Sequence, residues 1–127
     1  MIKKHSKIKI IMIDDDPDAL EITRARLEAK GFRFSGITDE VEGINAIRSD
    51  KPDIILLDIA MPRIDGYSLC RIIKGDKKLS RIPVIFITSK ELISSVEKGF
   101  ASGGDDYIIK PVDWDRLIEK IEKLLDK

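Results

Sequence analysis

The sequence predicts a single α/β domain of the doubly wound (βα)5 type, a five-stranded parallel sheet with helices on both faces. Two observations predict it. Short apolar runs alternate with amphipathic stretches from one end of the chain to the other, which is typical of parallel strands joined by helices. The apolar runs are also continuous rather than alternating, as expected for strands buried on both sides. Only five strand–helix units are present, whereas a closed barrel needs eight, so an open sheet is predicted.

The five expected strands are short runs rich in aliphatic and β-branched residues. They are predicted at residues 8–13, 32–37, 54–57, 84–87 and 107–109. Gly31 ends the helix before the second run, and Pro52 breaks the helical pattern before the third. This order of elements predicts a flavodoxin-like topology.

The helices are expected between these strands and after the last one. They are predicted from Pro17 to about Lys30, Asp39 to about Ser49, after Gly66, from about Leu92 to Phe100, and after Asp113. Asp before Pro17 is typical of an N-cap with proline at the first helical position. The residues expected to face the sheet are Leu20, Thr23, Leu27, Val41, Ile44, Ile47, Leu69, Ile72, Ile73, Leu117, Ile118, Ile121, Leu124 and Leu125.

Length and composition limit the class of protein. The 127 residues fit one domain spanning 1–127, with residues 1–6 as a short basic tail that includes the only histidine, His5. The 23 basic and 23 acidic residues balance, so direct binding to nucleic acid is not expected. Cys70 is the only cysteine, which favours a cytoplasmic location, and no apolar run approaches the roughly 20 residues of a membrane span.

Polar residues follow four of the predicted strands. Asp14 and Asp15 come after the first, Asp58 after the third, Thr88 after the fourth and Lys110 after the fifth. The carboxyl ends of parallel strands share one edge, where such sheets bind ligands. Clustered carboxylates suit magnesium, and a lysine with a hydroxyl group suits the oxygens of a phosphoryl group. Each residue alone has an ordinary explanation as a cap or turn, but their joint placement predicts a carboxylate that attacks a phosphoryl donor.

At these residues the chain resembles the receiver domains of response regulators in two-component signalling and phosphorelays. The resemblance runs from about Lys7 to Leu125, with its motifs in the family's order and spacing. They are Ile-Met-Ile-Asp14-Asp15-Asp16-Pro17, Leu56-Leu57-Asp58-Ile59-Ala60-Met61-Pro62, Asp65-Gly66, Val84-Ile85-Phe86-Ile87-Thr88-Ser89 and Asp106-Tyr107-Ile108-Ile109-Lys110-Pro111.

The resemblance implies a set of roles. Asp58 accepts a phosphoryl group from a phosphohistidine on a sensor histidine kinase or phosphotransfer protein. Magnesium is held by Asp58, by Asp15 directly, by Asp14 mainly through water, and by the backbone carbonyl of Ala60. Lys110 bridges to the phosphoryl group. The chain is then a switch that catalyses only its own phosphorylation and slow dephosphorylation, not an enzyme acting on other substrates.

The resemblance also implies how the signal leaves the site. Thr88 moves toward the phosphoryl oxygens, Tyr107 follows it inward, and the Lys110–Pro111 peptide is cis. The surface made by the fourth helix, fifth strand and fifth helix is the expected output face. Ser89 and Ala60 depart from the commonest family pattern, and we expect slow dephosphorylation, with a lifetime of many minutes or longer.

Other interpretations stay open at this point. A phosphatase of the haloacid dehalogenase type also places Asp-x-Asp after a strand, but it explains neither Asp58 nor Met61-Pro62. A non-phosphorylated interaction module would keep the fold without the chemistry. A nucleotide-binding protein is disfavoured because no glycine-rich loop follows the first strand.

No pattern in the sequence identifies the output of the switch or its partners. The chain is either a stand-alone regulator or a receiver from a longer protein with an effector domain. The downstream partner, the cognate kinase, the stimulus and a homodimer through the output face all stay open.

Overall fold

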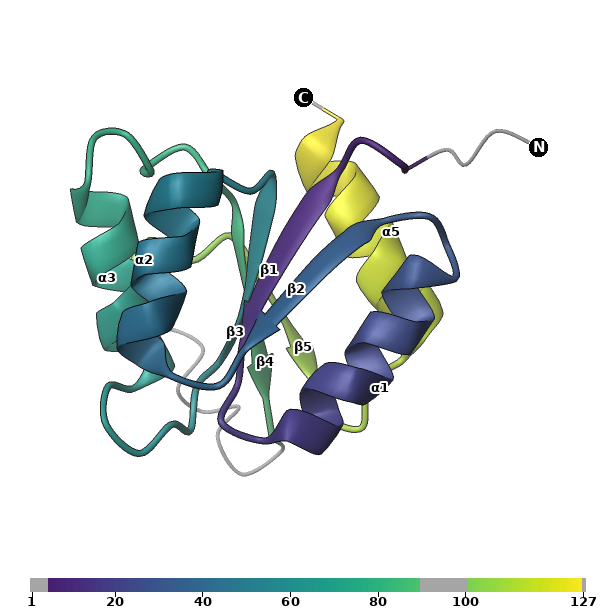
Figure 1. Ribbon diagram of the computed structural model, residues 1–127, viewed down its shortest axis with the longest axis horizontal. Coiled ribbons are helices and arrows are strands. Elements are labelled where there is room, and N and C mark those ends of the chain that lie inside the picture. The colour runs from purple at the N-terminus through teal and green to yellow at the C-terminus, as the bar shows by residue number, and fades with distance from the viewer. Residues whose placement is uncertain (1–4, 90–100, 127) are drawn as a thin grey trace.

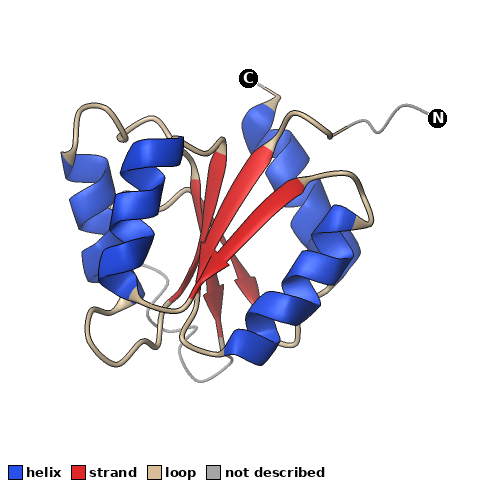
Figure 2. Ribbon diagram, viewed as in Figure 1, coloured by secondary structure: helices blue, strands red, loops and turns tan. Residues whose placement is uncertain are grey.

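The computed structural model describes residues 5–89 and 101–126 and contains the predicted doubly wound sheet. Its strands are β1 (Lys9–Ile13), β2 (Arg33–Ile37), β3 (Ile54–Asp58), β4 (Val84–Thr88) and β5 (Asp106–Ile109). They pair in parallel in the order β2-β1-β3-β4-β5 (Figures 1 and 2). The chain moves outward to one side of β1 with β2 and to the other with β3, so a switch point lies at β1, where open α/β sheets bind ligands.

Helices cover both faces of this sheet. The described helices are α1 (Pro17–Glu28), α2 (Glu40–Asp50), α3 (Gly66–Gly75) and α5 (Trp114–Leu125). Figure 1 shows α1 and α5 on one face and α2 and α3 on the other. Each begins after an aspartate whose side chain accepts a backbone N–H, at Asp16, Asp39, Asp65 and Asp113. The predicted helix at Leu92–Phe100 lies outside the described residues.

The core consists of two apolar layers, one on each side of the sheet. Successive residues of a strand point to opposite faces, so Ile11 and Ile13 pack toward α2 and α3, while Ile10 and Met12 pack toward α1 and α5. All five residues of β3 and of β4 are buried, which confirms that continuous apolar runs marked strands covered on both sides. Within the described residues, no helix combines the length and apolar character of a membrane span.

Two residues predicted to face the sheet are exposed instead. Val41 is 47% exposed because α2 approaches β1 through Gly43, where an added Cβ would collide with the Ile13 side chain. Val41 lies two residues before Gly43, about 200° around the helix, and therefore faces away from the sheet. Ile72 is exposed because its neighbour Ile73, about 100° further round, is the one buried.

His5 is also placed differently from the prediction, which assigned it to a charged tail. Its ring is buried and stacks on Phe32 at a centroid separation of 4.1 Å. Its Nδ1 lies 3.0 Å from the carbonyl oxygen of Lys30, and its Nε2 lies 2.8 Å from Oε2 of Glu122 on α5. Side-chain partners far apart in sequence hold this histidine, and tail composition gives no sign of them.

Candidate functional site

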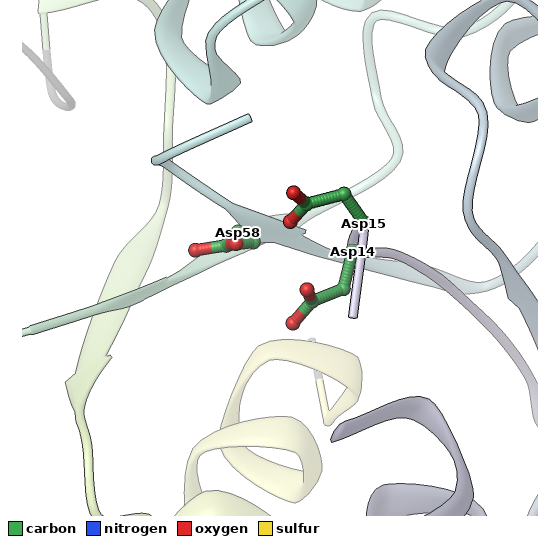
Figure 3. Close-up of side chains that lie close together, drawn as sticks. All are labelled: Asp14, Asp15 and Asp58. Carbon is green, nitrogen blue, oxygen red and sulfur yellow. The ribbon is translucent and has the colours of Figure 1, made fainter. Parts of the chain in front are cut away.

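The carboxyl edge of the sheet brings the predicted polar residues together. Asp14 and Asp15 follow β1, and Asp58 ends the neighbouring strand β3. Each of these three aspartates offers a carboxylate oxygen, and the three oxygens lie within 4.8 Å of one another. Figure 3 shows the carboxylates of Asp14 and Asp15 extending to the same side as that of Asp58.

Only one of the two carboxylate oxygens of Asp14 has a hydrogen-bond partner among the described residues. Its side chain is 0% exposed; Oδ1 accepts the Asp16 N–H at 2.9 Å, and Oδ2 has no hydrogen-bond partner among the described residues. Burial raises the pKa of Asp14 to about 6, with the Asp16 hydrogen bond opposing the rise and the charge of Asp58 adding to it. The structure therefore holds a carboxyl group that is costly to ionise without a nearby positive charge.

Asp58 is buried beside it. Its Oδ1 lies 3.4 Å from the Ala60 backbone nitrogen and 3.7 Å from Nζ of Lys110. Burial raises the pKa of Asp58, and the Lys110 charge is the largest influence that lowers it. Among the described residues, the contacts of the Asp58 carboxylate thus include a long hydrogen bond from Ala60 and the ion pair with Lys110.

Lys110 provides positive charge from the edge of the pocket. Its Nζ lies 3.7 Å from Asp58 and 3.8 Å from Asp14, within ion-pair range but too far for good hydrogen bonds. Its backbone N–H donates to the Thr88 carbonyl at 2.7 Å, which ties the end of β5 to β4. The Lys110–Pro111 peptide is cis, as the resemblance implied.

The remaining predicted residues surround this group. Thr88 is buried at the end of β4, and its Oγ1 donates to the Ser89 carbonyl at 3.3 Å. Tyr107 is half-buried on β5 next to Phe86, and Ala60 is exposed in the loop after β3. Their placement agrees with the predicted site, and their functional roles stay predictions.

Gly66 lies against the strand end that carries Asp58. A Cβ at this position would lie 2.6 Å from the carbonyl oxygen of Asp58 and 2.9 Å from Cα of Ile59. A larger residue would push α3 away from the strand end that carries Asp58. The Asp65-Gly66 pair therefore serves two purposes: Asp65 caps α3, and Gly66 lets the helix start close to β3.

The aspartate cluster fits a divalent cation. Three carboxylates repel one another when ionised, and a buried oxygen without a donor is a costly arrangement in water-poor surroundings. A hard dication favours such oxygens and relieves both costs.

Glu40 is a buried acidic residue that was not identified from the sequence. Glu40, at the start of α2, is buried, and its Oε2 has no hydrogen-bond partner within the described residues. An acidic residue in the first helical turn is usually solvated, so composition gave no signal for its burial.

A comparison with protein families identifies the family of this chain. Residues 10–122 match the family model described as the response regulator receiver domain. The chain belongs to this family. The match covers β2 to β5 and α1 to α3 in full, β1 from Ile10 onward, and α5 as far as Glu122. The receiver family is a phosphoacceptor signalling module.

Individual relatives agree with this assignment. The chain is 32% identical over 117 residues to the DNA-binding dual master transcriptional regulator RpaA of Synechocystis, covering 92% of this chain and 48% of RpaA. The chain therefore spans about half the length of the curated relatives it matches. A solved two-component response regulator from Clostridium difficile is 32% identical with a TM-score of 0.87, covering 95% of this chain and 98% of that one.

A receiver domain from a kinase is similar as well. The receiver domain of sensor histidine kinase PA1611 from Pseudomonas aeruginosa is 26% identical, with a TM-score of 0.86 and coverage of 94% of this chain and 98% of that one. Receiver domains with this fold thus occur in both regulators and kinases, and similarity alone does not assign this chain to either context.

Proposed function

We propose that Asp58 is the phosphoryl acceptor of this receiver domain. The observation that carries the proposal is the convergence of Asp14, Asp15, Asp58 and Lys110 at one edge of the sheet. Asp58 is the one carboxylate of the three that belongs to a strand, at the end of the central strand β3, with Lys110 within ion-pair range. A nucleophile in this position has a cation beside it and neighbours that favour a bound metal.

In the proposed reaction, a carboxylate oxygen of Asp58 attacks the phosphorus of a phosphohistidine. An O–P bond forms and the P–N bond breaks, and the imidazole of the donor leaves with the electron pair and takes a proton from solvent. Lys110 and Thr88 stabilise the phosphoryl oxygens with a positive charge and a hydroxyl donor. For Thr88 this requires its hydroxyl to leave the Ser89 carbonyl, so phosphorylation itself would reorient the side chain.

Asp14, Asp15 and Asp58 are the residues that would hold magnesium, with the Ala60 carbonyl as a further ligand. When bound, the ion supplies positive charge that offsets the carboxylates and the incoming phosphoryl oxygens. The PA1611 receiver structure is described as having a magnesium ion coordinated in its active-site cleft, which supports this choice of metal. The orphaned Oδ2 of Asp14 and the raised pKa of its carboxyl group support it independently.

The phosphoryl donor would be a sensor histidine kinase or a histidine phosphotransfer protein. A mainly apolar groove of about 350 Å³ opens beside Lys110, between α1 and the start of α5, with Ile22 and Trp114 among its lining residues. Ile22 is 55% exposed and lines this groove, so a docked partner would cover it. Docking there would present a phosphohistidine at the pocket mouth.

The output would leave through β5 and α5 together with the segment that precedes β5. The signal would pass to a downstream protein or to an effector domain. RpaA, as a DNA-binding regulator, is an example of a regulator with an effector domain. A homodimer through the same face, a cytoplasmic location and the lack of direct contact with nucleic acid or membrane complete the proposal.

Intact mass spectrometry tests the proposal. The protein is incubated with a small acyl phosphate, with and without magnesium, beside Asp58→Asn and the control Asp53→Asn at the opposite edge of the sheet. We expect one phosphoryl adduct in the wild type and in Asp53→Asn that needs magnesium, and none in Asp58→Asn. A folded wild type without an adduct would favour the interaction module, and steady phosphate release dependent on Asp14 would favour the phosphatase.

A further inference from the structure

Two lysines from opposite faces of the sheet bind consecutive aspartates at the entrance to β5. Lys74 on α3 places its Nζ 3.1 Å from Oδ2 of Asp105, and Lys120 on α5 places its Nζ 2.9 Å from Oδ1 of Asp106. Both lysine side chains are 17% exposed, so neither is an ordinary solvated surface charge. The two pairs hold the start of one short edge strand from both sides.

The two lysines differ in their other contacts. Lys74 also donates to the backbone carbonyls of Ser80 and Ile82, at 3.3 and 2.6 Å, and all of these partners are fixed parts of the fold. The ammonium group of Lys120 instead lies over the aromatic ring of Tyr107, 5.6 Å from its centroid. A cation at this distance is attracted to the ring face. Lys120 therefore joins α5 to a side chain on β5 that is only half-buried.

We propose that Lys120 is a positioning residue that holds Tyr107 in its half-buried resting position and thereby sets how readily the domain adopts its phosphorylated conformation. The inference rests on the proposed function of Asp58. It adds a regulatory contact on α5, outside the pocket, that no part of the phosphoryl-transfer step requires.

The position of Tyr107 connects this contact to the pocket. Tyr107 lies on β5 three residues before Lys110, which follows the end of that strand, and it pairs in register with Phe86 on β4. Thr88 is two residues after Phe86 on β4. The side chains of Tyr107 and Thr88 therefore lie on the same face of the sheet. A movement of the Tyr107 ring along this face toward Thr88 would carry it away from the ammonium group of Lys120.

The contact therefore belongs to one conformation and not to the other. An interaction present only in the resting state shifts the equilibrium toward that state by its own free energy, and loss of the interaction shifts it back. Phosphorylation and the conformational change are coupled, so a variant without the contact should accept a phosphoryl group faster. The expected gain is about three- to fivefold, as estimated for one partly exposed cation–π contact.

The test compares Lys120→Met, Lys120→Arg and Lys74→Met. Lys120→Met keeps a long apolar side chain and removes the charge. Lys120→Arg keeps a cation near the Tyr107 ring. Lys74→Met removes the ion pair with Asp105 and leaves the contact between Lys120 and Tyr107 in place. The double variant Lys120→Met with Asp106→Asn removes the aspartate that would otherwise lose its partner, and it serves if the single variant folds poorly. The readouts are the rate of Asp58 phosphorylation by an acyl phosphate with magnesium and the NMR resonances of the Tyr107 ring.

We expect Lys120→Met to phosphorylate faster and to move the Tyr107 resonances of the resting protein toward those of the phosphorylated wild type. Lys120→Arg should restore both values, and Lys74→Met should lower stability without the resonance shift. In a Tyr107→Leu background, Lys120→Met should no longer change the rate. A wild type that is phosphorylated normally, with the same rate and the same ring resonances in Lys120→Met, would overturn the inference. A wild type that forms no adduct would contradict the proposed function itself, while the ring resonances of the resting protein would still report on the contact.

Discussion

Charged groups have close partners at the amino edge of the sheet and lack them at the carboxyl edge, within the part of the chain that the structure describes. At the amino edge, polar groups that are buried or partly exposed are paired: Lys74 binds Asp105 and two carbonyls, and His5 lies between Lys30 and Glu122. At the carboxyl edge, Asp14 and Asp58 are buried beside each other, and Lys110 stays beyond good hydrogen-bond distance of both.

The difference separates what holds the fold from what performs the chemistry. A paired network fixes the amino ends of the strands, so the carboxyl ends can carry an arrangement that is unfavourable until a ligand binds. Such an arrangement lowers stability where it stands, and activity often requires it. The comparison predicts that substitutions at the two edges change stability in opposite directions.

The largest expected effect is at the amino edge. Lys74→Met should lower the free energy of unfolding by about 2–3 kcal/mol, because it leaves the Asp105 carboxylate and two carbonyls without their shared donor. Urea denaturation measures the change, with exposed Lys77→Met as the control. Equal stability of the two variants would mean that the amino edge is not the stabilising edge.

A smaller change of opposite sign is expected at the carboxyl edge. Without divalent metal at pH 7, Asp14→Asn should raise the free energy of unfolding by about 2 kcal/mol, because it removes a buried charge whose pKa is raised to about 6. The amide keeps an oxygen to accept the Asp16 N–H. Asp53→Asn should give no such gain, since Asp53 is exposed and accepts the Lys9 N–H. A loss of stability in Asp14→Asn would contradict the comparison.

The same carboxyl group predicts a dependence on pH. Its pKa is about 6 in the folded protein and 3.8 in an ordinary environment, so the folded state takes up a proton before the unfolded state does. Metal-free stability should therefore rise as pH falls through 6 and level off near 4, where both states are protonated. The gain between pH 7 and pH 5 is about 1–2 kcal/mol. Measuring the difference between wild type and Asp14→Asn at each pH isolates this group, and a difference independent of pH would contradict the assignment.

The smallest expected effect concerns the lifetime of the phosphoryl group. Ala60 is exposed two residues after Asp58, and its methyl side chain offers no polar atom to orient an attacking water. The purified phosphorylated domain should keep its phosphoryl group for many minutes, and Ala60→Asn should shorten the half-life by several-fold, about 1 kcal/mol in the barrier. Loss of the adduct is followed by mass after the donor is removed. A wild-type half-life of seconds would contradict this expectation.

The sequence was sufficient to predict the sheet and to predict which polar residues meet at its carboxyl edge. Continuous apolar runs mark strands buried on both faces, and the topology alone carries Asp14, Asp58 and Lys110 to one edge, whatever the details of packing. These features depend on the order of elements, which a single sequence displays directly.

Features that depend on contacts between elements were not predictable in this way. Val41 has the spacing of a core residue, yet the close approach of Gly43 to β1 turns it outward. His5 looks like part of a polar tail until Phe32 and Glu122 are placed around it. Lys120 carries no motif, and its contact with Tyr107 exists only because α5 packs beside the edge strand.

The most direct test of the two-edge account is the effect of magnesium on stability. Unfolding of wild type, Asp14→Asn and Lys74→Met is measured with and without millimolar magnesium, and binding to the folded state alone raises stability according to the affinity of the site. We predict that magnesium stabilises the wild type and Lys74→Met by the same amount and stabilises Asp14→Asn much less. Equal stabilisation of all three proteins, or none in the wild type, would contradict the claim that the carboxyl edge is built to bind a cation.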